Sequence, residues 1–332
     1  MAPIETLSGS KSFQGKEERF SQKAFDSFLS SGIGRKMIHI MVDRMYTHIP
    51  ERLFEWEGVD NIVKMHEKRL EGEKILIIAT HRSHADGAVT LGVIDKIRSE
   101  FEGEFNEVVY TVAGSMKTGD QGLLMKTLWD FGVEPVFNKS EVTPDFVVSD
   151  NDVNERKMKR PLGNGAYTKK AMKDHSILSA VHIEGSTMGG KINQKTGNLN
   201  GLQRMDKGFN SVLLAQIRSK IPTTILPVAI EGTENYFDPN TRSFNLTGMK
   251  SILEMLMVGE GTRVGNLDDK LTRFMFGENI PYKPGTVRIG VSQKLQDLSL
   301  PVKEMPNKVM RMIAQISSPK YLGDYGKHLL GI

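Results

Sequence analysis

Short apolar runs alternate with longer amphipathic stretches along the chain, beginning after Pro50. The apolar runs are of strand length and rich in Val, Ile and Leu, as in Ile75–Ala79 and Thr224–Ile230. Stretches of helical length lie between them, as in Val59–Leu70 and His84–Glu100. Strands that alternate with helices indicate βα units, and continuous apolar runs indicate strands covered on both faces. The pattern predicts an α/β fold with a mostly parallel central sheet flanked by helices.

Further elements continue this alternation to residue 316. The other predicted strands are Leu53–Trp56, Val108–Ala113, Pro135–Phe137, Ile177–Ile183 and Val287–Val291. The other predicted helices are Gln121–Phe131, Ala166–Asp174, Gly208–Lys220 and Val302–Ile316. Pro227 lies inside the predicted strand 224–230. Because proline donates no backbone hydrogen bond, we expect that strand to lie at a sheet edge or to end near the cleft.

Two parts of the chain differ in pattern. Residues 1–50 predict a polar tail followed by amphipathic helices, so a small N-terminal helical segment precedes the α/β domain of residues 51–332. That domain carries insertions at about 138–165 and 233–285. The basic-flanked helix Ile33–Ile49 and the Met-rich stretch Met249–Val258 suit either a bilayer surface or packing against the sheet.

Composition excludes several classes of protein. With 39% hydrophobic and 25% charged residues, the 332-residue chain is of globular type. It has no cysteine, which excludes disulfides, zinc–thiolate sites, iron–sulfur clusters and a cysteine nucleophile. It has no apolar run of about 20 residues and no apolar signal region, so we expect a cytoplasmic protein, free or on the inner face of a membrane. A net charge of +4 suits anionic partners but is too dispersed for nucleic acid.

Candidate catalytic side chains follow the predicted strand 75–79 directly. His81 and Asp86 lie at the start of the next helix, where the carboxyl edge of a parallel strand places ligands and reactive groups. A turn there can fold His81 over the first helical turn, so that Asp86 holds one imidazole nitrogen and leaves the other as a base. Residues Ser83–Asp86 also fit a helix capping box, in which Asp86 serves the helix alone.

A second polar loop follows the predicted strand 177–183. Residues Gly185–Lys191 approach the phosphate-loop pattern, but Ile192 replaces its magnesium-binding hydroxyl and no helix follows, so we expect no nucleoside-triphosphate site. What remains is a flexible backbone beside one carboxylate, Glu184, and one lysine. Such a loop suits a small polyol or phosphate.

Four elements in this order resemble the glycerolipid acyltransferase superfamily, which includes glycerol-3-phosphate and lysophosphatidate acyltransferases. The resemblance extends from about Leu53 to Ile316. Its blocks are H-x4-D, a glycine followed by a basic residue, Glu-Gly-Thr/Gly-Arg, and a strand with a late proline. The matching positions here are His81 and Asp86, Gly132 to Lys139, Glu184 to Thr187, and Pro227.

The resemblance implies transfer of a fatty acyl group from acyl-CoA or acyl-carrier protein to a hydroxyl of glycerol-3-phosphate or 1-acylglycerol-3-phosphate. It implies His81 as general base supported by Asp86, with no metal and no cofactor besides the acyl donor. Thr187 departs from the family, which has a phosphate-binding arginine there. The residues expected to bind substrate are Gly132, Lys139, Glu184, Gly185, Ser186, Lys191, Arg204 and Lys207.

Two other functions are compatible with the same sequence features. A thioesterase or other hydrolase would use the His81–Asp86 pair to activate water instead of an alcohol. A non-catalytic lipid-binding protein could keep the fold without the chemistry. Replacement of His81 and a test for acyl transfer to water distinguish the three.

Overall fold

The computed structural model describes residues 53–83, 85–102, 104–105, 107–111, 133–136, 177–219, 221–240, 243–257, 269–277, 284–298, 301 and 303–332. The N-terminal segment 1–50 and the insertion 138–165 lie outside these residues. The predicted helices 121–131 and 166–174 also lie outside them.

Eight strands of the described residues form one sheet in the order β1–β9–β6–β2–β5–β3–β4, with β10 also paired to β6. Strands β2 to β6 are parallel to their neighbours among themselves, whereas β9 and β10 run antiparallel to β6. All seven predicted strands are present, so the mostly parallel α/β sheet is confirmed. The strands are β1 (Phe54–Glu57), β2 (Lys74–Ala79), β3 (Glu107–Thr111), β4 (Val133–Val136), β5 (Ile177–His182), β6 (Thr223–Glu231), β9 (Gly285–Ile289) and β10 (Gln293–Lys294).

Four of the described helices match the predicted helices Val59–Leu70, His84–Glu100, Gly208–Lys220 and Val302–Ile316. The α-helices are α4 (Asp60–Lys68), α5 (Asp86–Glu100), α9 (Lys207–Ser219), α10 (Leu246–Met257), α11 (Asp269–Phe276), α12 (Met305–Ile316) and α13 (Pro319–Leu330). Short 3-10 turns are η1 (Thr187–Gly190), η2 (Thr233–Asn235) and η3 (Leu295–Asp297). A small hairpin of β7 (Phe237–Asp238) and β8 (Ser243–Phe244) precedes α10. Within the predicted insertion 233–285, the described residues therefore hold η2, this hairpin, α10 and α11.

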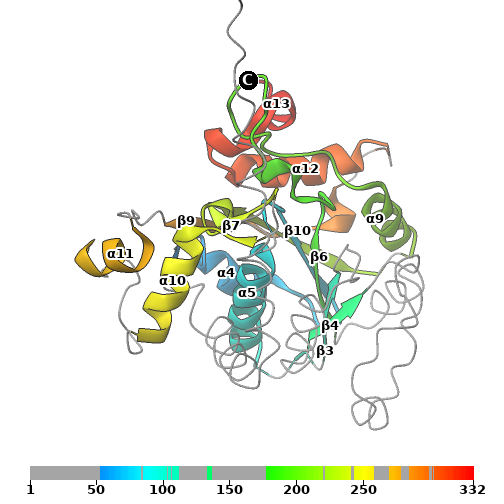
Figure 1. Ribbon diagram of the computed structural model, residues 1–332. Coiled ribbons are helices and arrows are strands. Elements are labelled where there is room, and N and C mark those ends of the chain that lie inside the picture. The colour runs from blue at the N-terminus through cyan, green and yellow to red at the C-terminus, as the bar shows by residue number, and fades with distance from the viewer. Residues whose placement is uncertain are drawn as a thin grey trace, which may run out of the picture. The chain divides into compact units, whose positions relative to one another are not determined.

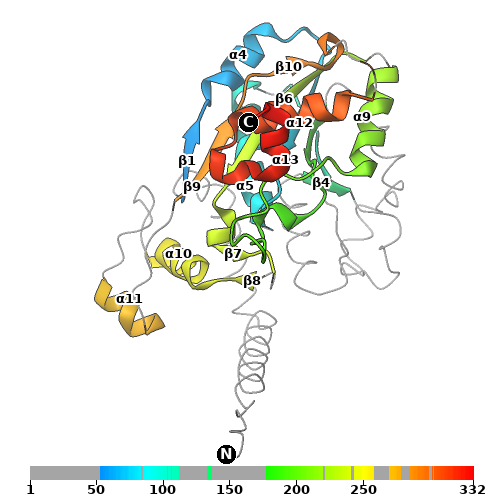
Figure 2. The same cartoon turned by 90° about the horizontal axis from the view of Figure 1, so that it is seen from above.

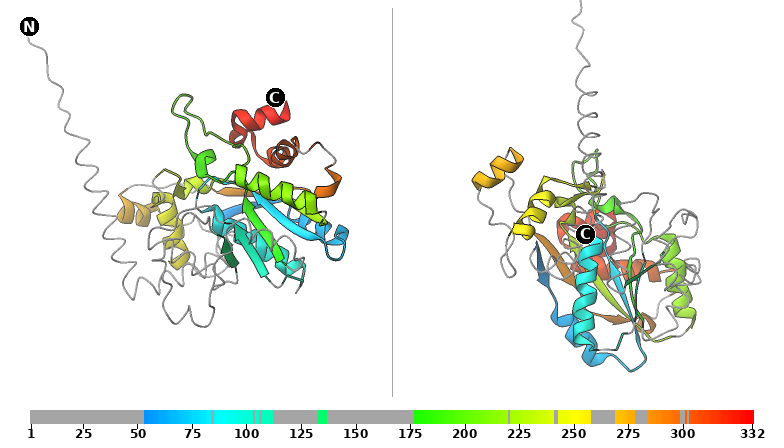
Figure 3. Two further views of the ribbon diagram at one scale, coloured as in Figure 1. Left: turned by 90° about the vertical axis from the view of Figure 1, so that its right-hand side faces the viewer. Right: turned by 60° about the horizontal axis from the view of Figure 1, so that its bottom comes forward.

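Helices cover both faces of the sheet (Figure 1). Helices α9, α12 and α13 share one face, where their apolar side chains meet those of β2, β5 and β6 in a buried cluster. Helix α5, with α4 beside it, lies on the opposite face, as Figures 1 and 3 show. Every residue of the central strands β2 and β6 is buried, which explains their continuous apolar sequences. The prediction of a sheet covered on both sides is confirmed.

A β-bulge interrupts the pairing of β6 with the strands after it. Val228 pairs with Ile289 and Ile225 with Gln293, so three residue steps in β6 oppose four in the partner. Pro227 lies at this point, and its carbonyl accepts a hydrogen bond from the Gly290 amide at 2.9 Å. In a strand the amide and the carbonyl of one residue point to the same side, so any other residue at position 227 would also point its amide hydrogen toward Gly290. The expectation of an edge or strand-end position for Pro227 was wrong, because the bulge accommodates proline inside a central strand.

The C-terminal helix α13 follows the last predicted helix and was not predicted. It packs beside α12 above the sheet, as Figure 2 shows. The helix contains Gly323 and Gly326, and the backbone of Gly323 leaves the helical region within it, so its apolar periodicity is broken. Among the described residues, no helix combines the length and apolar character that a membrane span requires.

Candidate active site

His81 lies just beyond the carboxyl end of β2, on a backbone that neighbouring strands hold in place. The hydroxyl of the preceding Thr80 donates to the Ile230 carbonyl of β6 at 3.0 Å and accepts from the Ile230 amide at 2.8 Å. The amide of His81 donates to Glu184 Oε2 at 2.6 Å. The side chain of His81 remains 14% exposed.

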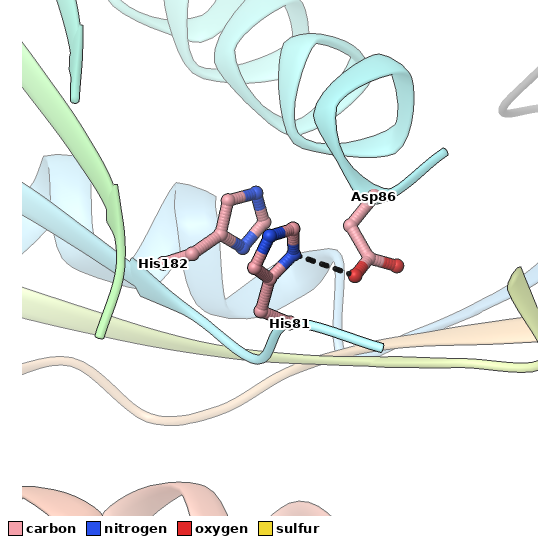
Figure 4. Close-up of side chains that lie close together, drawn as sticks. All are labelled: His81, Asp86 and His182. Atoms are coloured by element: carbon pink, nitrogen blue, oxygen red, sulfur yellow. Dashed lines mark hydrogen bonds and ion pairs between the residues drawn. The ribbon is translucent and has the colours of Figure 1, made fainter. Parts of the chain in front are cut away.

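Asp86 is the first residue of α5, and its side chain is completely buried. Its Oδ2 lies 3.1 Å from His81 Nδ1, the contact drawn in Figure 4. The same oxygen accepts hydrogen bonds from the amides of Arg82 and Ser83, the latter at 2.9 Å. The N-cap of α5 is Ala85 and no side chain caps the helix, so the expected capping box over Ser83–Asp86 was wrong. These hydrogen bonds instead order the turn before the helix. The turn after β2 brings His81 and Asp86 together in the way the sequence suggests.

Thr233 completes the hydrogen bonding of this carboxylate. Its hydroxyl, on the 3-10 turn η2 after β6, donates to Asp86 Oδ1 at 2.5 Å. Burial raises the pKa of the Asp86 carboxyl, whereas the nearby His182 and the donated hydrogen bonds lower it. Burial has the larger effect, so the pKa of this carboxyl lies above its ordinary value despite the four groups that contact its two oxygens. Sequence reasoning missed Thr233, although it closely follows a predicted strand.

A second histidine stacks on the first. The rings of His81 and His182 lie 4.4 Å apart at 18° to each other, as Figure 4 shows. His182 ends β5, where it pairs in register with Ala79 of β2, and it is buried. Its Nδ1–H donates to the Thr80 carbonyl at 2.6 Å, which holds the ring in place beside His81. Sequence reasoning missed His182, because only the order of the strands reveals that β5 lies beside β2.

Glu184 is buried beneath the loop that carries His81. Besides the His81 amide, it accepts from the Gln203 amide at 2.7 Å and pairs with Arg82 Nη1 at 3.1 Å. Neither side chain of the Arg82–Glu184 pair is exposed. Burial raises the pKa of the Glu184 carboxyl, and the Arg82 guanidinium opposes that rise. These contacts make Glu184 a support for the His81 backbone, a role that differs from the substrate contact implied by the resemblance.

The remaining expected binding residues are dispersed over the following loop. Gly185 has a φ of +64°, and a Cβ there would lie 2.9 Å from Asp206, so glycine is required. Ser186 is exposed and Lys191 half-buried. Arg204 is exposed, with its guanidinium 5.9 Å from the Tyr325 ring, and the exposed Lys207 begins α9. Gly132 and Lys139 lie outside the described residues.

His81, Asp86 and His182 also offer donor atoms within 4.8 Å of one another, a spacing compatible with a metal ion. The carboxylate oxygens, however, already accept four hydrogen bonds. A metal would have to displace some of these bonds, including the His81 contact. The arrangement therefore suits an imidazole held by a carboxylate better than a metal centre.

No family model matches the chain, and no curated protein matches it. Among solved structures it is similar to the 1-acyl-sn-glycerophosphate (LPA) acyltransferase PlsC from Thermotoga maritima. The two are 14% identical over 89% of this chain and 88% of that chain, with a TM-score of 0.39. So loose an overlap does not establish the family of this chain. The case for its function rests on the residues of the site.

The geometry defines what these residues can do. His81 presents Nδ1 to Asp86, so Nε2 is the ring nitrogen that can face a reactant, and the side chain is partly exposed. An imidazole oriented in this way can take a proton from a hydroxyl or from water. The buried carboxylate fixes the tautomer and stabilises the imidazolium that forms.

Proposed function

We propose that the protein is an acyltransferase, which moves a fatty acyl group from an acyl thioester to a hydroxyl of glycerol-3-phosphate or 1-acylglycerol-3-phosphate. The observation that carries the proposal is the His81–Asp86 pair, joined at 3.1 Å at the carboxyl edge of a parallel strand. The resemblance of four ordered sequence blocks to glycerolipid acyltransferases selects acyl transfer among the reactions open to such a pair.

In the proposed reaction His81 Nε2 removes the proton from the acceptor hydroxyl as its oxygen attacks the thioester carbonyl. A tetrahedral intermediate forms and collapses, and the carbon–sulfur bond breaks. The departing thiolate takes the proton back from the imidazolium, so His81 is regenerated. Asp86 keeps Nδ1 protonated and balances the positive charge of the ring. No covalent acyl-enzyme is required, in keeping with the absence of cysteine.

The acceptor phosphate needs cationic partners, and Thr187 leaves the position of the family's arginine without charge. We propose that the loop after β5 supplies replacements from Lys191, Arg204 and Lys207, together with Lys139 and Gly132 of the earlier block. Gly185 and Ser186 would shape the pocket. Glu184 would act indirectly, by holding the His81 backbone.

The lipid product suggests that the reaction takes place at a membrane surface. On α10, Leu246 and Met249 are 44% and 43% exposed, as expected for side chains that can enter a bilayer interface. The helix predicted at 33–49 lies outside the described residues. We expect the protein to sediment with vesicles of anionic lipid, and unchanged sedimentation of a Leu246→Gln/Met249→Gln variant would argue against this surface.

The decisive test is incubation of the purified protein with radiolabelled acyl-CoA and, separately, acyl-carrier protein. Each donor is offered with glycerol-3-phosphate, 1-acylglycerol-3-phosphate, dihydroxyacetone phosphate or an uncharged glycerolipid. We expect acylation of a phosphate-bearing acceptor. His81→Ala and Asp86→Asn should each lower the rate by about 100-fold or more while the fold persists. His328→Ala, which replaces an exposed histidine on α13, serves as the matched control.

Other outcomes discriminate the alternatives. Release of free fatty acid at the same rate with and without acceptor would identify a thioesterase. Full biological activity of His81→Ala would instead identify a non-catalytic lipid-binding protein. Either result would overturn acyl transfer.

A further inference from the structure

A cavity of about 490 Å³ lies at the edge of the sheet opposite His81. His81 follows the carboxyl end of β2, whereas the cavity is bounded by Thr224, near the amino end of the parallel strand β6. The C-terminal end of α4, the bulge with β10, and α12 form its other walls. Its volume lies in the range of small-molecule sites.

The β-bulge gives this cavity its polar wall. In a regular strand consecutive side chains point to opposite faces. Here Ser292, Gln293 and Lys294 are consecutive, and all three line the cavity. The extra residue opposite β6 lies between Ile289 and Gln293, in the segment whose first residue, Gly290, faces Pro227. Bulges are common next to functional sites, and this one brings a serine, a glutamine and a lysine into the lining of one cavity.

The charges of the lining favour an anion. Two of its cations are already paired, since Arg69 contacts Glu104 and Lys294 lies 3.5 Å from Glu73. Lys68 at the end of α4 and Lys308 on α12 make no ion pair with the residues that the structure describes. These two lysines come from different helices and line the same cavity. A phosphate group could accept hydrogen bonds from both, and from Ser292.

One carboxylate in the lining favours a ligand that carries hydroxyl groups as well as a phosphate. Asp297 borders the cavity beside Leu298, and a carboxylate repels inorganic phosphate but accepts hydrogen bonds from hydroxyl groups. We propose that the cavity binds a phosphate monoester that carries a ribose-like diol, with its phosphate at Lys68 and Lys308 and its hydroxyls at Asp297. A sugar phosphate and a nucleotide share this chemistry. The proposal does not depend on acyl transfer.

The experiment is calorimetric titration of the full chain with ribose 5-phosphate, AMP and inorganic phosphate. We expect at least one ester to bind, and inorganic phosphate to bind about tenfold more weakly or worse. Binding of ribose 5-phosphate alone identifies a sugar phosphate site, AMP alone a nucleotide site, and both identify the ribose phosphate as the common determinant. Failure of both esters to bind, or equal binding of inorganic phosphate, would overturn the proposal.

Variants locate the binding. Lys68→Glu/Lys308→Glu should weaken the ester about 100-fold, and the milder Lys68→Gln/Lys308→Gln about tenfold. Lys303→Glu/Lys327→Glu makes the same change of net charge at exposed lysines outside the cavity and should leave binding intact. Asp297→Ala should weaken the ester yet strengthen inorganic phosphate. If the two double reversals behave alike, the ligand lies elsewhere, for example in the proposed active site.

Discussion

At the scale of single residues, the site depends on buried charges that cost stability unless they are paired. Glu184 pairs with Nη1 of Arg82 and also accepts hydrogen bonds from two backbone amides, those of His81 and Gln203. Arg82 Nε and Nη2 have no hydrogen-bond partner within the described part of the chain. Burial of this pair therefore costs folding stability. We attribute its presence to the support that it gives the His81 backbone.

Glu184→Ala should destabilise the protein by about 3–5 kcal/mol, because it leaves a buried guanidinium without its counter-charge. Glu184→Gln keeps one acceptor oxygen and should cost about 1–2 kcal/mol. Chemical denaturation of both variants measures these values. If instead Glu184→Gln raises the KM for the acceptor and leaves the free energy of unfolding unchanged, Glu184 contacts substrate directly.

Glu234 provides a pH-dependent test. Its Oε1 accepts from the Tyr321 hydroxyl at 2.5 Å, whereas its buried Oε2 has no partner among the described residues. Burial raises the pKa of this carboxyl, so the folded chain binds its proton more tightly than the unfolded chain. The resulting stability is present at acidic pH and is lost as pH rises through the folded-state pKa.

Glu234→Gln cannot ionise and should therefore raise the free energy of unfolding by about 1 kcal/mol at pH 8. The gain should vanish at about pH 3, which lies well below the ordinary pKa of glutamate, so that the wild-type carboxyl is protonated in both states. Denaturation curves at the two pH values, with the exposed Glu67→Gln as control, measure the difference. A gain of equal size at both pH values would show that ionisation of Glu234 does not cause it.

At the scale of elements, the sequence predicts the strands better than it predicts the residues that contact His81 and Asp86 from other strands. β2, β5 and β6 were predictable because both faces of each are covered, and the His81–Asp86 contact followed from one local turn. His182 and Thr233 were missed because they depend on strand order, which local pattern does not contain. Helix α13 was missed because Gly323 interrupts its periodicity.

The turn η1 should tolerate no side chain at Gly190. A Cβ there would lie 2.0 Å from the Arg82 carbonyl oxygen, so the loop would have to move away from the His81 backbone. Gly190→Ala should cost about 3 kcal/mol or more and lower the transfer rate. Gly197→Ala is the matched control, because a Cβ at Gly197 would meet no atom within 4 Å. Only the φ of +71° opposes alanine there, and this backbone strain should cost about 1 kcal/mol. Equal losses in the two variants would contradict close packing at Gly190.

At the scale of the whole molecule, the sheet presents different chemistry at its two edges. The carboxyl edge was predictable, because parallel βα units place reactive loops there. The cavity at the amino edge was not, because it forms from a bulge opposite Pro227 and from helices distant in sequence. Pro227 could be read from the sequence, but the bulge beside it depends on which strand pairs with β6.

The C-terminal helix α13 contacts residues that support the proposed active site. The ring of Tyr321 lies 5.9 Å from the Arg82 guanidinium, its hydroxyl donates to Glu234, and its carbonyl accepts from the Leu202 amide at 2.8 Å. Tyr321, Leu322 and Leu329 are buried. Although α13 is far from His81 in sequence, it stabilises both the Arg82 loop and the turn η2 that carries Thr233.

A chain that ends at Ser318 should therefore lose about 4 kcal/mol or more of stability and also the proposed transfer activity, although His81 and Asp86 are unchanged. A chain that ends at Leu330 is the control, because the residues it lacks, Gly331 and Ile332, are exposed. Should the shorter chain fail to fold, Tyr321→Phe isolates one contact and should cost about 1 kcal/mol. Thermal unfolding and transfer assays measure both effects. Wild-type stability and rate in Tyr321→Phe would show that the hydroxyl supports neither Glu234 nor the turn beside it.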